Sequence, residues 1–396
     1  MSVAMQEAWS AYLRGLEEIR QSIFTHRFAE GDRERNEAYY LFHQIQAEAF
    51  QVAVAPRPDY PRFYSLFDPM TFTWGIPNPD FIYTRTYLDG RRTYRIRGKR
   101  GNSLFLVIQA INAHLTLPPE RLKLLGEFDL DALKIGGDGN FEFIASATKQ
   151  PGNWIPLDPS SDRNFILVRE AFVDWSSEQR TLMQVEVMDE LEPRPIVYGE
   201  AEMIRRLEDA LRFMKTLVLG VSIKGVEDVF NMAGGWNRFA VPKFSGAAAA
   251  ANNATYNMLA YRIEPEEALI IEIDPPNPRY WGIQLGDTWN QALDYTFHQS
   301  TLNMHQAAAD ADKKVRVVVC HRDPGIRNWL TPVDSHKGTV MVRWYFAQGA
   351  ATPTARLVPY AEIDRHLPPD AARITPEARR AELKGRRRAI ERRFTH

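Results

Sequence analysis

The segment from residue 268 to residue 346 carries the clearest strand pattern of the chain, in which short apolar runs alternate with turn-forming Gly, Pro, Asn and Asp. Similar runs recur in the first half of the sequence. Parallel βαβ units would need a helix after each strand, whereas many short strands joined by turns are typical of antiparallel sheets. The pattern therefore predicts a mainly β fold built from antiparallel sandwiches.

Two groups of strands are expected, one in each half of the chain. The Asp89-Gly90 dipeptide separates two strands of the first group and indicates a β-hairpin, because Asp-Gly favours a tight two-residue turn. The first group is expected at 81–88, 92–96, 103–111, 141–146, 165–172 and 182–188. The second group is expected at 257–263, 268–274, 279–285, 315–321, 339–346 and 354–358.

Helical spacing of apolar residues predicts helices over residues 4–24 and 32–54. A third set of apolar residues at helical spacing, from Met203 to Val218, predicts a helix that packs against one of the sheets. Residues 376–396 contain eight Lys or Arg and three Glu. We interpret this last segment as a solvated terminal helix, with a contact to a polyanion as the alternative.

Composition limits the class of protein and its partners. A chain of 396 residues is long enough for two domains with separate cores. Its net charge of −1 predicts no attraction to nucleic acid or to an anionic membrane. The single cysteine, Cys320, excludes an intrachain disulfide, and the N-terminal residues lack a signal-peptide pattern. We therefore expect a cytoplasmic protein without membrane partners.

Several longer motifs carry a family resemblance. In the first half they are PNPDFIY (77–83), RRTYRIRGKRG (91–101), GNFEFIAS (139–146) and QPGNWIPL (150–157). In the second half they are RYWGIQLGDTW (279–289), ALDY (292–295), HRDPGIRNWL (321–330) and SHKGTVMVRW (335–344). Through these motifs the chain resembles bacterial proteins that contain a DUF1214 domain preceded by a DUF1254-like region. That family has no assigned function.

The resemblance implies an architecture and no catalytic residues. It predicts an immunoglobulin-like N-terminal β-domain, a C-terminal jelly-roll-like β-sandwich and a helical insertion. The expected division is N-terminal helices (1–60), a DUF1254-like β-domain (61–195), a helical linker (196–256), a DUF1214-like jelly roll (257–375) and a basic terminal helix (376–396).

His321 and Asp323 are the first candidate site. If the strand that begins at residue 315 stays extended up to Pro324, alternation places both side chains on one face. A carboxylate beside a histidine fixes its tautomer and raises its basicity, as a general base requires. The alternative is a pair of strand-end residues satisfied by backbone groups and by Arg327.

Histidines could also hold a metal ion. His298, His305 and His336 are the candidates beside His321, but their spacing contains no adjacent ligand pair, so the fold would have to bring them together. Structural histidines hydrogen-bonded under loops are the alternative. No other cofactor is expected.

A second set of residues could contact a substrate. Arg322 and Arg343 could bind a carboxylate or a phosphate in forked geometry. Four aromatic or polar residues could line the pocket, although such residues also occur in ordinary cores. They are Trp281, Asn290, Tyr295 and Trp329.

The sequence contains no P-loop, no G-x-G-x-x-G after a strand and no G-x-S-x-G elbow. We therefore expect a small-molecule enzyme of bacterial catabolism or secondary metabolism. Its acid–base chemistry (hydrolysis, elimination or isomerisation) would need no nucleotide and would take place in the C-terminal sandwich. The alternatives are a module that binds a carbohydrate or lipid-like ligand without chemistry, and an assembly protein that forms a homo-oligomer.

Overall fold

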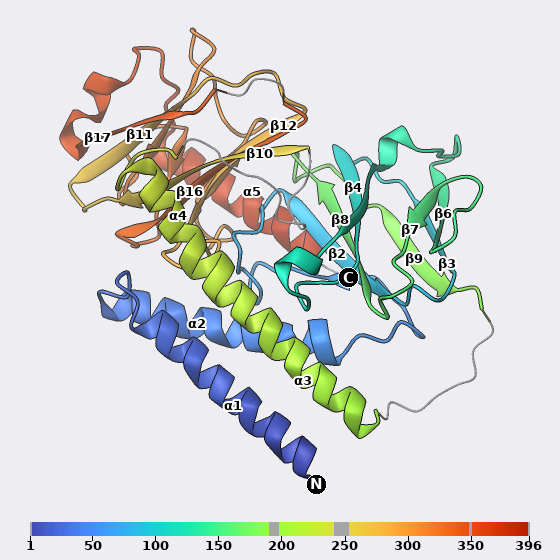
Figure 1. Cartoon of the computed structure of the whole chain (residues 1–396). Coiled ribbons are helices and arrows are strands. Elements are labelled where there is room, and N and C mark those ends of the chain that lie inside the picture. Colours follow the sequence, from blue (N-terminus) through green and yellow to red (C-terminus); the bar gives the residue numbers. More distant parts are fainter. Residues whose placement is uncertain (1, 190–197, 241–252, 348–350, 395–396) are drawn as a thin grey trace. The chain divides into compact units, whose positions relative to one another are not determined.

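The structure is a computed structural model that describes residues 2–189, 198–240, 253–347 and 351–394 (Figure 1). The chain forms two compact units, each built from several segments. Unit 1 consists of Met1–Asp68, Phe81–Phe172 and Glu178–Gly220. Unit 2 consists of Pro69–Asp80, Val173–Ser177 and Val221–His396. The expected linker boundary near residue 195 and the small-residue run at 246–252 lie outside the described residues.

Unit 1 contains two sheets that face each other. The five-stranded sheet has the order β1 (Tyr64–Ser65), β2 (Phe81–Leu88), β8 (Asn164–Ala171), β4 (Phe105–Ile111) and β5 (Leu124–Asp129). The four-stranded sheet has the order β7 (Trp154–Pro156), β6 (Asn140–Ser146), β3 (Tyr94–Lys99) and β9 (Leu182–Val187). One apolar cluster joins them, with Ile108 and Val168 from the first sheet and Ile96 and Phe143 from the second. Short helices η2 (Pro119–Arg121) and η3 (Leu130–Ala132) lie in the connections.

The predicted hairpin at Asp89-Gly90 is wrong, because β2 and β3 belong to different sheets. The backbone does turn there, since the N–H of Arg92 donates to the carbonyl of Asp89 at 3.0 Å. Glycine is required for a different reason: a Cβ atom at position 90 would lie 1.8 Å from the carbonyl oxygen of Asp158. The dipeptide thus forms a sandwich corner packed against a neighbouring loop, rather than a hairpin.

Three helices form a layer in unit 1. They are α1 (Val3–Phe24), α2 (Asp32–Ala49), which continues as the π-helix η1 (Phe50–Val54), and α3 (Glu200–Lys215). The expectation that α3 packs against a sheet is largely wrong, because α3 packs mainly against α1, α2 and η1 (Figure 1). Its contact toward the sheet side runs through Phe213, whose ring centroid lies 5.4 Å from that of His114. Beyond α3 the helix continues as the π-helix η4 (Thr216–Ile223) and α4 (Lys224–Ala233).

Unit 2 contains a second pair of facing sheets. One has the order β10 (Ala254–Arg262), β16 (Lys337–Tyr345), β12 (Tyr280–Gly286) and β13 (Thr301–Asn303). The other has the order β15 (Trp329–Leu330), β14 (Val315–Val319), β11 (Glu267–Ile273) and β17 (Thr354–Pro359). Their shared core contains Ile283 and Val342 from the first sheet and Ile271 and Val317 from the second. Two β-sandwiches with helical segments confirm the predicted fold class.

The C-terminal helix α5 (Pro376–Phe394) is docked rather than simply solvated, which corrects the interpretation of its basic composition. Three arginines seven residues apart lie on one face of the helix, since seven residues make two turns. The Nε of Arg379 donates to Oδ2 of Asp323 at 3.1 Å, and Arg393 donates to the carbonyl of Pro79 at 2.9 Å. The guanidinium carbon of Arg386 lies 4.6 Å from the ring centroid of Trp175. The helix is preceded by the 3-10 helix η5 (Tyr360–His366).

A buried carboxylate joins distant segments of unit 2. Asp80 is fully buried, and its Oδ1 accepts from Nε1 of Trp175 at 2.7 Å and from Nδ2 of Asn303 at 2.6 Å. Its Oδ2 accepts from the hydroxyl of Tyr280 at 2.6 Å. Burial raises the pKa of Asp80, and these hydrogen bonds oppose that effect. The contacts explain why two short segments, Pro69–Asp80 and Val173–Ser177, belong to unit 2.

Candidate functional site

The five-stranded sheet of unit 1 has two very different faces. Even-numbered residues of β4 and β8, such as Ile108 and Val168, face the apolar core. The opposite face, here called the polar face, carries Arg85, Tyr87, Gln109, Phe165 and Arg169, all of which are buried. Burying polar side chains costs free energy unless each finds a partner. Such a face departs from ordinary sheet patterning, and departures of this kind concentrate at functional sites.

Arg85 and Glu48 form an ion pair at the centre of the polar face. Both side chains are fully buried, and the two groups meet through two hydrogen bonds, one of them Nη2 to Oε2 at 3.0 Å. Nη2 of Arg85 also donates to Oε1 of Gln51 at 2.9 Å, and the ring centroid of Tyr64 lies 4.9 Å from the guanidinium carbon. Burial raises the pKa of Glu48, and attraction to Arg85 offsets part of that rise.

Tyr87 and His114 form a hydrogen-bonded pair on the same face. The Tyr87 hydroxyl lies 2.8 Å from Nδ1 of His114. Burial, followed by the positive charge of Arg85, holds the pKa of His114 well below its ordinary value. Burial likewise raises the pKa of Tyr87 well above its ordinary value. Both groups are therefore neutral, and the phenol donates to Nδ1 when the ring proton of His114 is on Nε2.

Aromatic rings hold His114 in place. Its ring is parallel to that of Phe165, with centroids 3.8 Å apart and an interplanar angle of 3°, and the ring of Phe213 meets it edge-on. Across the described part of the chain, no hydrogen bond reaches Nε2 of His114. In the tautomer with the proton on Nε2, the ring presents an N–H that no hydrogen bond of the described residues uses.

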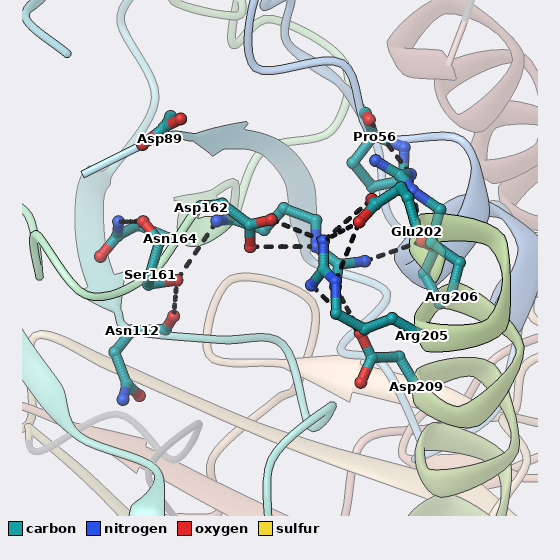
Figure 2. A network of polar contacts seen from close by, with 12 residues as sticks. Pro56, Asp89, Asn112, Ser161, Asp162, Asn164, Glu202, Arg205, Arg206 and Asp209 are labelled. Atoms are coloured by element: carbon teal, nitrogen blue, oxygen red, sulfur yellow. Dashed lines mark hydrogen bonds and ion pairs between the residues drawn. The ribbon is translucent and has the colours of Figure 1, made fainter. Parts of the chain in front are cut away.

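A polar network fixes the elements that carry this site (Figure 2). Arg163 and Arg206 donate to the carbonyl of Ala53, and Arg206 also donates to that of Val54 at 2.6 Å. Guanidinium groups at these carbonyls cap the C-terminal end of η1 and complement its dipole. Because η1 continues α2, capping its end also fixes Glu48 and Gln51 opposite Arg85.

The same network anchors the segment that carries His114. Figure 2 shows Arg205 between Asp162 and Glu202, with hydrogen bonds of 2.6 Å and 2.7 Å. The neighbouring Ser161 donates from its hydroxyl to the carbonyl of Asn112 at 2.6 Å, two residues before His114. Helix α3 and the 158–164 loop therefore hold both the ion pair and the histidine in position.

His321 and Asp323 have separate hydrogen-bond partners in the structure. Strand β14 ends at Val319, so the alternation that would align the two side chains stops before them. Nε2 of His321 lies 3.0 Å from the carbonyl oxygen of Ile263. Asp323 accepts from the N–H of Gly325 at 2.8 Å and from Arg379. Their joint catalytic role stays a prediction.

The candidate metal ligands lie in separate contacts. Nδ1 of His298 is 3.0 Å from Oδ2 of Asp294, and the rings of His321 and His336 have centroids 5.0 Å apart. The backbone N–H of His305 donates to Oδ1 of Asn303 at 3.0 Å. Within the described ranges, no group of three or more His, Cys, Asp or Glu is placed to hold a metal ion.

The predicted substrate-contacting residues of unit 2 have structural partners. Exposed Arg322 pairs with Glu266 at 2.8 Å, while buried Arg343 donates to Gln284 and to the carbonyl of Ile76. Anion binding by either arginine stays a prediction.

The remaining predicted residues pack or hydrogen-bond inside unit 2. Trp281 packs beside Trp344 in the core, and Nε1 of Trp329 donates to the carbonyl of Cys320 at 2.9 Å. Asn290 has a positive φ of 61° and donates to the carbonyl of Val221 at 3.0 Å. Tyr295 is buried.

Sequence reasoning missed Arg85, Tyr87, His114 and Glu48. One signal was present: in FIYTRTYL (81–88) the odd positions hold Phe, Tyr, Arg and Tyr, so one face of a central strand had to be polar and aromatic. Nothing local distinguishes Glu48 on its helix or His114 in its loop, because only the fold brings them to that face.

Residues 84–171 match the model of a family described as "Protein of unknown function (DUF1214)". The chain is therefore a protein of two β-sandwiches that contains a DUF1214 domain, which confirms the resemblance over this range. The match includes Arg85, Tyr87 and His114. It falls within residues 61–195, where the DUF1254-like domain was expected, and outside 257–375. The DUF1254-like assignment stays a prediction.

One solved structure extends the likeness beyond this domain. An uncharacterised protein from Burkholderia cenocepacia is similar over 89% of this chain and 97% of its own length, with 26% identity and a TM-score of 0.81. The VPA0106 protein from Vibrio parahaemolyticus is matched over 81% of this chain and 98% of its own, with 11% identity and a TM-score of 0.49. No curated protein matches the chain.

No helix in the described residues combines the length and the apolar character needed to cross a membrane.

Proposed function

We propose that the chain is a small-molecule enzyme that uses acid–base chemistry without a nucleotide cofactor. Tyr87 and His114 would transfer the proton, in place of His321 and Asp323. The reaction would be an elimination or an isomerisation, in which a proton leaves one carbon atom and a proton is delivered to another atom of the same molecule.

The observation that carries the proposal is the 2.8 Å contact between the Tyr87 hydroxyl and Nδ1 of His114 in a buried, aromatic setting. Burial raises the pKa of Tyr87 and lowers that of His114, so both groups stay neutral and would move protons only together with transfer to and from the substrate. In a balanced step, the proton on Nε2 of His114 passes to the carbonyl oxygen of the substrate, Nδ1 takes the proton of the Tyr87 hydroxyl, and the Tyr87 oxygen takes the proton that leaves the substrate carbon.

The ion pair between Arg85 and Glu48 would adjust the pKa values of Tyr87 and His114. The positive charge of Arg85 lowers the pKa of both Tyr87 and His114, whereas Glu48 raises that of Tyr87. Anion formation on Tyr87 therefore becomes easier when Arg85 is less neutralised. Gln51 and Tyr64 keep partial exposure, so they mark the side from which a ligand would approach.

The substrate would be flat and mostly apolar, with an acidic C–H beside a carbonyl group. The rings of Phe165 and Phe213 give the imidazole an apolar surrounding, and Nε2–H of His114 would donate to a carbonyl oxygen. Burial of the pair keeps bulk water away, which favours proton transfer within the substrate over hydrolysis.

Solvent deuterium exchange tests the proposal and does not require the product to be identified. A panel of small keto acids, enones and aromatic ketones is incubated in D₂O with the full chain, and loss of each C–H signal is followed by proton NMR. At least one compound should exchange, and Tyr87→Phe and His114→Gln should slow that exchange by roughly 10²-fold or more.

Tyr94→Phe is the matched control. Its hydroxyl is also buried and donates to the carbonyl of Pro58 at 3.0 Å, but its ring belongs to the sandwich core on the other side of the sheet. This variant should lose stability and keep the exchange rate of the folded protein. Full exchange in Tyr87→Phe would remove the pair from the mechanism. Binding without exchange would favour a ligand-binding module instead.

A further inference from the structure

We propose that unit 2 binds a small apolar carboxylate in a cavity of about 620 Å³ on the outer face of the sheet that contains β11 and β17. The inner face of this sheet, with residues such as Leu269 and Ile271, belongs to the sandwich core. The cavity therefore lies on the opposite side, and it is independent of the acid–base pair proposed for unit 1.

Four of the ten residues that line the cavity are apolar. Ile270 and Leu367 line it, and both also belong to a cluster that joins the outer face of the sheet to η5. Charged residues lie beside this cluster on the neighbouring strands. Arg356 is the cross-strand neighbour of Ile270, and Arg316 is the cross-strand neighbour of Glu272. A ligand in the cavity would thus meet both apolar and charged side chains.

Most charges around the cavity are already neutralised. Arg316 is in ion pairs with Glu272, Asp310 and Asp312, at distances of 2.9, 2.7 and 2.7 Å. Arg365 pairs with Glu362 at 3.1 Å. Neither arginine therefore has an uncompensated positive charge to offer a ligand.

Arg356 differs from its neighbours. Throughout the described residues no carboxylate lies within ion-pair distance of its guanidinium, and its hydrogen bond is a 3.3 Å contact from Nη1 to Nδ1 of His366. Since a guanidinium can only donate, Nδ1 of His366 is the acceptor and its ring proton is on Nε2. Arg356 thus keeps its full charge and most of its donors, and His366 supplies a further N–H.

The single arginine without a carboxylate partner determines which class of ligand the cavity would bind. One available guanidinium matches one carboxylate, which it can hold through two parallel hydrogen bonds. Dianions would face Glu272 and Glu362 without a second free cation. The apolar lining residues favour a ligand whose body is a short aliphatic chain or a single aromatic ring.

The test is a titration of the full chain with benzoate, followed by calorimetry and by the ring resonances of His366. Benzamide is the neutral isostere. Arg373→Gln is the control variant, because Arg373 is an exposed arginine paired with Asp364 and does not line the cavity. Benzoate should bind wild type and Arg373→Gln and shift the His366 resonances. Arg356→Gln should bind at least about 10-fold more weakly, the usual loss for a charge-assisted contact.

Three results would overturn the proposal. They are equal affinity of Arg356→Gln and wild type, equal affinity for benzamide and benzoate, and no heat or resonance shift with benzoate at millimolar concentration. Arg356 lies on an exposed edge strand, so the variant is expected to fold, and its circular dichroism spectrum checks this.

Discussion

Replacing Glu48 with Gln should destabilise unit 1 strongly, because it removes the carboxylate that neutralises buried Arg85. Both side chains are fully buried, so water cannot replace the lost charge. Removing one partner of a buried ion pair costs roughly 3–5 kcal/mol. Glutamine keeps the size of the side chain and one acceptor oxygen, so we expect a loss near the lower end, about 3 kcal/mol.

Hydrogen–deuterium exchange measured by mass spectrometry is the appropriate assay, since two units need not unfold together. Peptides from β2 should lose protection, while peptides from β12 in unit 2 serve as an internal reference. Glu18→Gln, which breaks an exposed pair with Lys215, is the control and should change little. Combining Glu48→Gln with Arg85→Met should recover much of the loss, because no buried charge then remains.

If Glu48→Gln lowered the free energy of unfolding by less than about 1 kcal/mol, the unpaired charge of Arg85 would cost no more than an ordinary surface effect, contrary to the prediction. A double variant less stable than Glu48→Gln would also contradict it. That result would mean that packing or hydrogen bonding of Arg85, rather than its unpaired charge, dominates.

Three further predictions concern other buried groups. His114 stays neutral in the fold and takes up a proton below about pH 6.5 when unfolded, so the stability of unit 1 should fall as pH drops below that value, by up to about 1.4 kcal/mol per pH unit. His114→Gln should flatten this dependence in denaturation curves, with exposed His43→Gln as the comparison. Asp80→Ala leaves three donors without an acceptor and should cost unit 2 on the order of 3 kcal/mol or more, read as lost protection in β12. Gly90→Ala forces a Cβ against a backbone carbonyl and should cost about 2 kcal/mol in the same exchange assay on β2, whereas Gly137→Ala, with open space around it, should not.

The fold class could be predicted from the sequence because it depends on local patterns. Strand β2 coincides with the expected run 81–88, since an apolar-aromatic segment flanked by turn residues has few alternatives. Which strands pair could not be predicted. The Asp89-Gly90 turn has the same composition whether its strands form a hairpin or leave for different sheets, and only the contact with Asp158 distinguishes the two.

The candidate site was harder to predict than the fold. The expected dyad depended on a strand that reaches His321, but β14 ends at Val319. The pair that the structure does form joins residues 87 and 114, and the ion pair joins residues 48 and 85. Sequence spacing carries no information on such contacts, because they depend on the helix layer that covers the sheet.

Nitrogen-15 NMR of histidine-labelled protein reports directly on whether Nδ1 of His114 accepts the proton of Tyr87. We predict that Nδ1 of His114 resonates as an unprotonated acceptor and Nε2 as a protonated nitrogen, unchanged from pH 8 to about pH 5, since the pKa of His114 lies well below the ordinary value of about 6.5. We also predict that Tyr87→Phe shifts the Nδ1 resonance. A His114 that titrates near pH 6.5, or whose proton is on Nδ1, would contradict the account, because the ring could then not accept the proton of Tyr87.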